Sequence, residues 1–386
     1  MEYLSRENLD QLLTIEPHTP AVTIYIPMLA TAAPPHITEK QIRFKNLITR
    51  AIEQLENIQK GSALIKELRQ YQQKLQDDLE FWKDQTAGLL ICAAPGLFRL
   101  FHLPYDTEEF VSVGDNFFLA PVLSILHDAQ SYYVLTIAQQ KPQLFNGDLY
   151  GLHPTDLQLP TDVATALNID ENNQKSENQS SAMGSSLSTQ GFNGRGGGRN
   201  PAENDRLQFF RIVDTMVNRY IHADTPLILA GIDAEVAEYR AISKYPRILE
   251  SSIVGSYSNI KPEDVSSEAA RIIEQEIVLP AHSAVIEEYK QIHGANPDRS
   301  ATDKTAIAEA AEQGRIDKLL VRMTRTTTDV VRDTMQAAKR ITFPEAEIST
   351  SLNDLAIKVW QMSGTVIGLA ANEIPNGAPM VARLRY

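Results

Sequence analysis

A polar, glycine-rich stretch that leads directly into an amphipathic helix constrains the fold of this 386-residue chain more than any other feature. Residues 171–193 show no hydrophobic periodicity, so they cannot contribute to a packed core. They lead into a run of glycines and arginines: Gly194, Arg195, Gly196, Gly197, Gly198 and Arg199. We therefore expect residues 171–200 to form a surface loop within an otherwise folded domain.

The residues that follow the glycines predict a helix whose first turn adjoins the loop. Asn200 is a suitable N-cap, Pro201 fits the first helical position, and Glu203 occupies the carboxylate position of a capping box. Residues at helical spacing then predict one buried face: Leu207, Phe210, Val213, Val217 and Tyr220. A helix N-terminus carries partial positive charge and free N–H groups, which attract anions. The loop is therefore expected to contact phosphate or another oxygen-rich surface.

Three interpretations of the glycine run compete. A phosphate-binding P-loop requires a Lys-Ser or Lys-Thr pair after the glycines, and none follows them. A dinucleotide-binding fingerprint requires glycine at the position of Arg199 and a strand before the run, and the chain has neither. A low-complexity surface linker stays open as the plain structural alternative. The capped, basic helix start favours a functional loop tip over that linker.

Composition narrows the class of protein. Hydrophobic residues make up 43% of the chain, which is ample for packed cores, and the length suggests two or three domains. No apolar run reaches the roughly 18 residues of a membrane-spanning helix, and the polar N-terminal residues do not resemble a signal peptide. The single cysteine, Cys92, lies in an apolar run and is expected as a buried strand thiol, with catalysis as the less favoured alternative. These features favour a cytoplasmic location.

The net charge of −13 argues against a protein that coats nucleic acid indiscriminately, but local basic patches can still contact RNA. A predicted helix over residues 38–58 carries Lys40, Arg43 and Lys45, which form either an ordinary solvated face or an RNA-facing edge. Near the C-terminus, three arginines flank a threonine run and form either a solvated surface or a contact to ribosomal RNA or a partner protein: Arg322, Arg325 and Arg332.

Alternating strand and helix patterns predict an α/β protein of three domains. We expect an N-terminal α/β domain over residues 1–128, in which strands at 21–26, 87–93, 97–102 and 109–113 combine with two long helices. A middle domain over 129–298 contains the glycine-rich loop at 171–200, and Asn146-Gly147 predicts a tight turn between its first strands. A C-terminal α/β domain covers 299–386.

Other chemistry has little support in the sequence. The eight histidines show no tight metal-binding spacing, and no G-x-S-x-G nucleophile motif is present. Asp128, Asp214 and Asp233 are scattered, so no carboxylate pair for magnesium-dependent nuclease work can be placed. We therefore predict no metal site, no cofactor and no catalytic residues.

The order of domains and several short motifs resemble the archaeo-eukaryotic class I peptide release factor and Pelota family, and its bacterial members most. The family's middle domain carries G-R-G-G-Q in a loop before its main helix, and residues 194–198 match four of these five positions. The segment from Ala308 to Val321 resembles the helix-to-strand turn of the family's third domain, and Ala382 to Tyr386 its final strand. The resemblance covers residues 130–386. The family's Asn-Ile-Lys-Ser stop-codon motif is not seen.

The resemblance implies a ribonuclease-H-like middle domain and a C-terminal domain like ribosomal protein L7Ae. It also implies a cytoplasmic factor in the aminoacyl-tRNA site of the 70S ribosome, contacting 16S and 23S ribosomal RNA. The loop Gly194–Arg199 would approach the peptidyl transferase centre, and Lys40, Arg43 and Lys45 the decoding side. The third domain would meet a translational GTPase, for which the elongation factor that delivers tRNA is the expected partner.

Gly198 stands where the release factors have the glutamine that helps water attack peptidyl-tRNA. The resemblance therefore favours a non-hydrolytic hibernation factor that protects idle ribosomes. Peptide release from stalled ribosomes is one alternative, because the backbone N–H at this position survives and such a group can stabilise an oxyanion. A nucleic-acid-binding or nuclease stress protein is the other.

Overall fold

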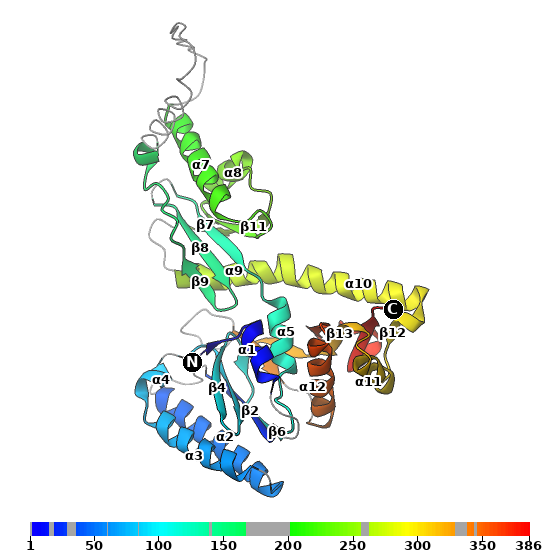
Figure 1. Cartoon of the computed structure of the whole chain (residues 1–386). Helices are drawn as coiled ribbons and strands as arrows, with labels where there is room; N and C mark the ends of the chain where they lie inside the picture. The colour runs from blue at the N-terminus through cyan, green and yellow to red at the C-terminus, as the bar shows by residue number, and fades with distance from the viewer. Residues whose placement is uncertain are drawn as a thin grey trace, which may run out of the picture. The chain divides into compact units, whose positions relative to one another are not determined.

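The computed structural model divides the chain into two compact units. The terminal unit comprises Met1–Ala129 together with Ala281–Tyr386, and the middle unit comprises Gln130–Pro280. The structure describes residues 2–14, 19–28, 36–59, 61–83, 85–138, 141–166, 201–255, 262–328, 338–342 and 346–386. Sheets and helices alternate in both units, which confirms the predicted α/β class (Figure 1).

The N-terminal part of the terminal unit is built on a five-stranded sheet. Its strand order is β1 (Glu2–Tyr3), β4 (Leu97–Leu103), β3 (Gly88–Ala94), β2 (Ala21–Pro27) and β6 (Phe110–Gly114). The β4–β3, β3–β2 and β2–β6 pairs are antiparallel, and β1 adds to β4 in parallel. Cys92 is fully buried in β3, as predicted, and burial raises the pKa of its thiol. This thiol has no access to solvent.

Helices cover one face of this sheet. These are α2 (His36–Asn57), α3 (Ser62–Gln76) and the short α4 (Leu79–Lys83), and α2 and α3 run side by side (Figure 1). Because side chains alternate along a strand, Val22, Ile24 and Ile26 of β2 all face the helices. Phe44 and Trp82 complete that core, with ring centroids 5.3 Å apart. Residues 77–78 separate α3 from α4.

The C-terminal part of the terminal unit has its own four-stranded sheet. The order is β12 (Ser300–Ala301), β17 (Met380–Leu384), β13 (Ile316–Arg322) and β16 (Thr365–Leu369). Helix α10 (Leu279–Ala295) packs Ile286 and Tyr289 against Leu320, Ile367 and Val381 of this sheet. Helices α11 (Lys304–Glu312) and α12 (Ala346–Gln361) also pack on these strands.

The N- and C-terminal parts are joined through buried polar contacts. Helix α5 (Ala120–Asp128) lies against β16, and Asn353 of α12 bonds its first turn. The Asn353 side chain is 2% exposed and accepts hydrogen bonds from the backbone N–H groups of Leu119 (2.7 Å) and Ala120 (3.1 Å). A three-stranded sheet adds a second link, because β5 (Asp106–Thr107) pairs with β15 (Ala338–Thr342), which pairs with β14 (Thr324–Thr328).

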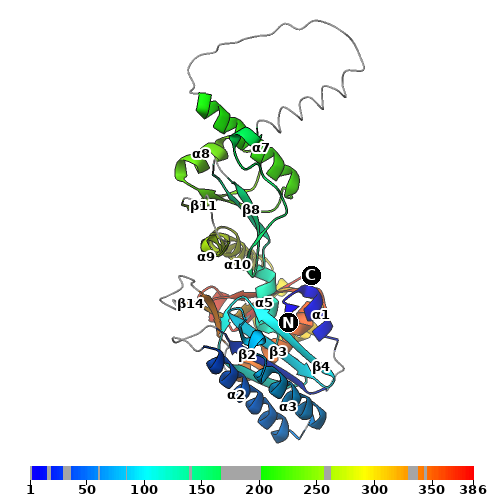
Figure 2. The same ribbon diagram turned by 90° about the vertical axis from the view of Figure 1, so that its left-hand side faces the viewer.

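The middle unit is a five-stranded sheet with helices on both faces (Figure 2). The order is β11 (Ile248–Val254), β10 (Leu227–Gly231), β7 (Tyr132–Thr136), β8 (Gln143–Asp148) and β9 (Gly151–Pro154). On one face Leu227 and Leu229 pack against α7 (Pro201–Tyr220) and α8 (Asp233–Ile242). On the other, Ile228 and Ala230 pack against α9 (Pro262–Ile273). The parallel strands β7 and β10 are thus covered on both sides, whereas the edge strand β11 is only partly buried.

The predicted turn at Asn146-Gly147 is wrong. Both residues lie inside β8, where Gly147 pairs with Tyr132, and the turn comes two residues later between Asp148 and Gly151. A Cβ atom on Gly147 would lie 2.3 Å from the Tyr132 ring. This glycine therefore makes room for an aromatic side chain on the neighbouring strand. An Asn-Gly pair in the sequence cannot distinguish such a glycine from one in a turn.

The middle unit also ends earlier than the expected boundary at residue 298. Helix α9, a π-helical turn η1 (Glu274–Val278) and α10 follow one another without a break. The unit boundary falls at Pro280, since the apolar face of α10 packs on the C-terminal sheet. The three-domain division itself stays a prediction. Within the described part of the chain, no helix combines the length and apolar composition that crossing a membrane requires.

Candidate functional site

The predicted loop site, Gly194 to Arg199, lies outside the described residues, but the two ends of that segment are described. A short helical stretch at 163–166 ends with the buried Ala166, and the chain is described again from Pro201, where α7 starts. Ala166 belongs to the same core as α7. Ala166 of this stretch and Phe209 of α7 therefore lie in one hydrophobic core of the middle unit.

Helix α7 is fixed firmly on the sheet. Phe209, Phe210, Val213 and Val217 are at most 2% exposed and pack on β7, β10 and α8. The predicted apolar face is thus confirmed at Phe210, Val213 and Val217, but Tyr220 is 39% exposed. Its hydroxyl donates to an Asp156 carboxylate oxygen at 2.5 Å, and this bond is the largest cause that raises the pKa of Tyr220.

A buried carboxylate ties α7 to α8. Asp214 is 4% exposed and accepts hydrogen bonds from the Tyr239 hydroxyl (3.2 Å), the Ser243 hydroxyl and the Lys244 backbone N–H (3.1 Å). Burial, followed by the neighbouring Asp214 charge, raises the pKa of Tyr239. The Asp214 carboxylate accepts three hydrogen bonds that hold α7 in place, so its role is structural.

The three predicted RNA-facing cations on α2 do not form one cluster. Residues 40 and 43 are three apart and share a side of the helix, whereas residue 45 is about 160° away from residue 43 around the axis. Burial, then the nearby Arg43 charge, lowers the pKa of Lys40. Lys45 is exposed. The structure therefore separates Lys45 from the other two cations.

The Arg43 guanidinium is occupied by protein groups. Its Nη1 donates to the Pro27 carbonyl at 2.7 Å, its Nη2 to Glu39 at 2.9 Å and its Nε to Glu109 at 2.9 Å. The side chain is only 15% exposed. Arg43 thus holds the start of α2 against the end of β2 and the segment before β6. Contact of these cations with RNA stays a prediction.

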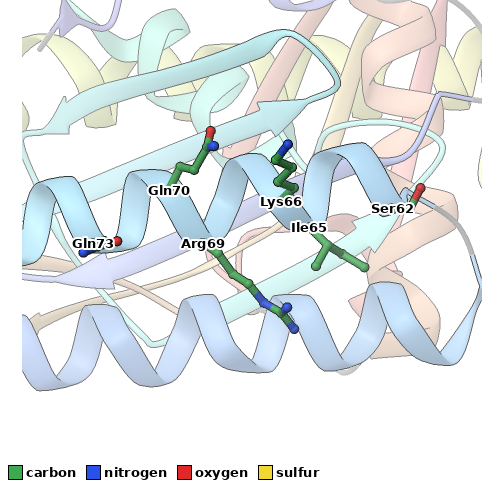
Figure 3. Close-up of a pocket in the computed structure, with 6 residues that line it drawn as sticks. All are labelled: Ser62, Ile65, Lys66, Arg69, Gln70 and Gln73. Carbon is green, nitrogen blue, oxygen red and sulfur yellow. The ribbon is translucent and has the colours of Figure 1, made fainter.

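A cationic face on α3, not predicted from the sequence, lies beside α2. A shallow groove of about 290 Å³ is lined by Ser62, Ile65, Lys66, Arg69, Gln70 and Gln73 (Figure 3). Arg69 extends toward α2 and pairs with Glu56 at 3.1 Å, while Lys66 and Gln70 project from the other side of the helix (Figure 3). The sequence carried a signal for this face: Lys66 and Arg69 are three residues apart, and Glu67 is the one carboxylate of α3.

In the C-terminal part, the predicted turn is present at Gly314, whose φ of +65° favours glycine. Leu319 and Leu320 follow in β13 and are fully buried. Arg322 is half-buried at the end of β13. The Arg325 backbone belongs to β14, and Arg332 lies outside the described residues.

The scattered acids do not assemble into a metal centre. Asp128 lies in the terminal unit, where its carboxylate is 2.8 Å from His282 Nε2, while Asp214 and Asp233 lie in the middle unit. Within the described ranges, no three side chains of histidine, cysteine, aspartate or glutamate are placed to hold a metal ion. The absence of a metal or cofactor in the whole chain stays a prediction.

The middle unit combines a mixed five-stranded sheet with a helical layer on each face. Residues 132–275 match the family model for bacterial archaeo-eukaryotic release factor family 7. The match lies in the middle part of the chain. The matched range includes the glycine run Gly194–Arg199 and the whole of α7. No match was found among curated protein sequences.

Several solved structures are similar over long stretches at low identity. The archaeal translation termination factor aRF1 is 13% identical, with 100% of this chain and 99% of that chain covered, at a TM-score of 0.24. Archaeoglobus fulgidus Pelota is 14% identical over 77% of this chain and 79% of its own, at a TM-score of 0.35. A model of ribosome-bound archaeal Pelota and ABCE1 is 13% identical over 100% and 95%, at 0.37.

Proposed function

We propose that this protein is a ribosome-associated factor that occupies the aminoacyl-tRNA site. The observation that carries the proposal is the match of residues 132–275 to a release factor family, because this range contains the glycine-arginine segment and the helix that follows it. The helix that follows the glycines, α7, is held rigidly on the sheet of the middle unit. Backbone N–H groups of glycines and two arginines suit the phosphates of 23S ribosomal RNA.

The remaining parts take the positions that the family resemblance suggests. The N-terminal part, with α2 and α3, faces 16S ribosomal RNA on the decoding side. The C-terminal part, an L7Ae-like domain in this proposal, meets a translational GTPase such as the elongation factor that delivers tRNA. The middle unit is the ribonuclease-H-like domain of the proposal. The protein acts in the cytoplasm, where its ribosomes are.

The loop favours occupation of the ribosome over hydrolysis. Peptidyl-tRNA hydrolysis requires a group that positions water near the ester, and Gly198 has no side chain for that task. The arginines on either side can still hold the loop against RNA. We therefore propose a hibernation factor, which keeps an idle ribosome from engaging other ligands, without an enzymatic step.

Sedimentation with purified 70S ribosomes tests this proposal. The wild-type chain should pellet with empty ribosomes and should release no labelled peptide from ribosomes that carry peptidyl-tRNA. Replacing Arg195 and Arg199 with alanine should weaken pelleting and reduce the slope of log affinity against log salt by about one to two, because two phosphate contacts are lost. The matched control removes Arg271 and Lys290, each of which pairs with a glutamate three residues away.

Other outcomes point elsewhere. Peptide release by the wild-type chain would replace hibernation with rescue of stalled ribosomes. Absence of pelleting, together with magnesium-dependent cleavage of free RNA, would replace both with the nuclease alternative. Equal binding by the arginine variant and the control would contradict the placement of the loop.

A further inference from the structure

We infer that the outer face of α3 is a sequence-independent RNA-binding surface that docks on the phosphate backbone. We define this α3 outer face by the polar residues that line its groove: Ser62, Lys66, Arg69, Gln70 and Gln73. The inference rests on the proposed function, since it names the element through which the N-terminal part would contact RNA. It assigns that contact to α3, whereas the sequence had pointed to α2.

The charge of α3 differs from that of the rest of the molecule. The helix carries Lys66, Arg69 and Lys74 but only one carboxylate, Glu67, within a chain of net charge −13. Both Glu67 carboxylate oxygens accept from the backbone N–H of Gly96, at 3.3 and 3.1 Å. Lys66 and Lys74 are exposed, and neither has a carboxylate partner among the described residues. The local field of this face is therefore positive.

The donors of the α3 outer face share one broad side of the helix, with Arg69 at the edge toward α2 and Lys66 and Gln70 at the opposite edge (Figure 3). Lys66, Arg69, Gln70 and Gln73 stand at i, i+3, i+4 and i+7, so they cover about 10 Å of one helical face. Lysine, arginine, glutamine and serine side chains are among the groups that contact phosphate oxygens in nucleic-acid complexes. Their helix is rigid, because Leu64, Leu68 and Leu75 are buried on its opposite side. Such a face can bind phosphates without further ordering of the backbone.

The Arg69 pair with Glu56 does not remove this capacity. The two side chains are 63% and 53% exposed, and exposed ion pairs contribute only about 0–1 kcal/mol. A phosphate can therefore replace Glu56 at small cost. Arg43 of α2 differs, because its buried guanidinium already bonds Pro27, Glu39 and Glu109.

Two observations favour the RNA backbone over bases or an acidic protein surface. Tyr71 of α3 stacks on Phe98, with ring centroids 3.8 Å apart, so its ring is not open for base stacking. Among the residues that line the groove, only the half-buried Ile65 is apolar by type, whereas protein interfaces usually centre on large apolar or aromatic anchors. A polar and cationic face without such an anchor fits phosphates best.

The test measures binding of the full chain to 70S ribosomes and to a labelled RNA duplex at several salt concentrations. Replacing Lys66 and Arg69 with glutamate should lower RNA affinity roughly tenfold or more and reduce the salt slope by about one to two. The double variant Lys66→Arg and Arg69→Lys should bind like the wild type, because both charges are kept. The control pair Arg271→Ala and Lys290→Ala should leave both affinities almost unchanged, and thermal unfolding should show that all variants are folded.

The outcomes separate this inference from the proposed function. If the wild-type chain binds ribosomes and the glutamate variant binds both ribosomes and RNA equally well, the α3 inference fails and the proposed function stands. If the variant loses ribosome binding while neither protein binds the RNA duplex, the partner of α3 is a protein and the inference also fails. If RNA binding through α3 is found without ribosome binding, the proposed function fails and the inference stands.

Discussion

At the scale of single residues, two cationic side chains on one helix have different roles. Arg43 and Lys45 are two positions apart on α2, yet the Arg43 guanidinium bonds three protein oxygens and Lys45 is exposed. A largely buried arginine with satisfied donors fixes structure, because removing it takes these hydrogen bonds away from the Pro27 carbonyl and the two carboxylates. An exposed lysine contributes little to stability and stays available for a ligand.

Replacing Arg43 with alanine should therefore destabilise the terminal unit by about 2 kcal/mol, the scale of hydrogen bonds to charged groups. Lys45→Ala should change the free energy of unfolding by less than about 0.5 kcal/mol. Both tryptophans, Trp82 and Trp360, lie in the terminal unit, so urea unfolding followed by tryptophan fluorescence reports on this unit alone. A cost for Lys45→Ala as large as that for Arg43→Ala would contradict the distinction.

At the scale of elements, the exposed edge of the middle sheet is protected by side chains. β11 is an edge strand, and such a strand presents unpaired backbone groups that can recruit another chain. Glu276 of the π-helical turn accepts from the backbone N–H groups of Glu250 (2.8 Å) and Ser251 (2.7 Å). Arg240 donates to the carbonyls of Leu249 (2.7 Å) and Glu250 (3.1 Å). The π-helical turn thus places a carboxylate where a neighbouring strand would otherwise pair.

The Glu276 contact predicts a pH dependence for this edge. Burial alone would raise the pKa of Glu276, but hydrogen bonds from Ser251 and Glu250 and the Arg240 charge hold it below its usual value. A carboxyl group whose pKa is lowered by folding stabilises the fold above its unfolded pKa of about 4.3, and this contribution is lost as the pH falls through the folded value.

Amide hydrogen exchange at Glu250 and Ser251 measures this effect. At pH 7, Glu276→Gln should lower the protection of both amides several-fold, because two bonds to a charged acceptor weaken. The difference from the wild type should shrink below about pH 4, where the wild-type carboxyl also becomes neutral. A difference that stays constant down to pH 3 would show that the carboxylate charge has no part in protecting the edge.

At the scale of the whole molecule, the two ends of the chain fold into one unit, and the middle unit is inserted between them. Asn353 is the central link, since its side chain accepts from Leu119 and Ala120 and donates to the Phe117 carbonyl at 2.9 Å. Arg6 lies over the Trp360 ring at 4.7 Å, and the Trp360 Nε1 donates to Asp10 at 2.7 Å. These contacts make the N- and C-terminal parts cooperative with each other.

Replacing Asn353 with alanine should uncouple the two parts. The change leaves two buried N–H groups and one carbonyl unsatisfied, each at a cost of about 1–3 kcal/mol. In single-tryptophan proteins, Trp82 reports on the N-terminal part after Trp360→Phe, and Trp360 reports on the contact between the parts after Trp82→Phe. Because Trp360→Phe also removes the contacts with Arg6 and Asp10, each protein is compared with its own background without the Asn353 change. Without the Asn353 change the two urea midpoints should coincide, and with it they should separate. Coincident midpoints in both backgrounds would mean that the link lies elsewhere.

Local patterns in the sequence determined the α/β class, most strands and the positions of the long helices. The reason is physical: alternation on β2 and helical spacing on α7 follow directly from which faces must be buried. Cys92 was correctly predicted as buried, since an apolar run in a central strand leaves no exposed side. The resemblance of residues 194–198 to the release factor loop likewise needed no coordinates, because it is carried by consecutive residues.

Contacts between distant residues were decided only by the tertiary structure. Gly147 has the sequence of a turn but lies in a strand, because the Tyr132 ring occupies the space of its missing side chain. In the sequence Arg43 resembles any other helical cation, and only the structure shows that Glu109, 66 residues away, lies beside it. Asn353 joins the chain ends across more than 230 residues. Such partners are close in space and far apart in sequence, so local periodicity carries no signal for them.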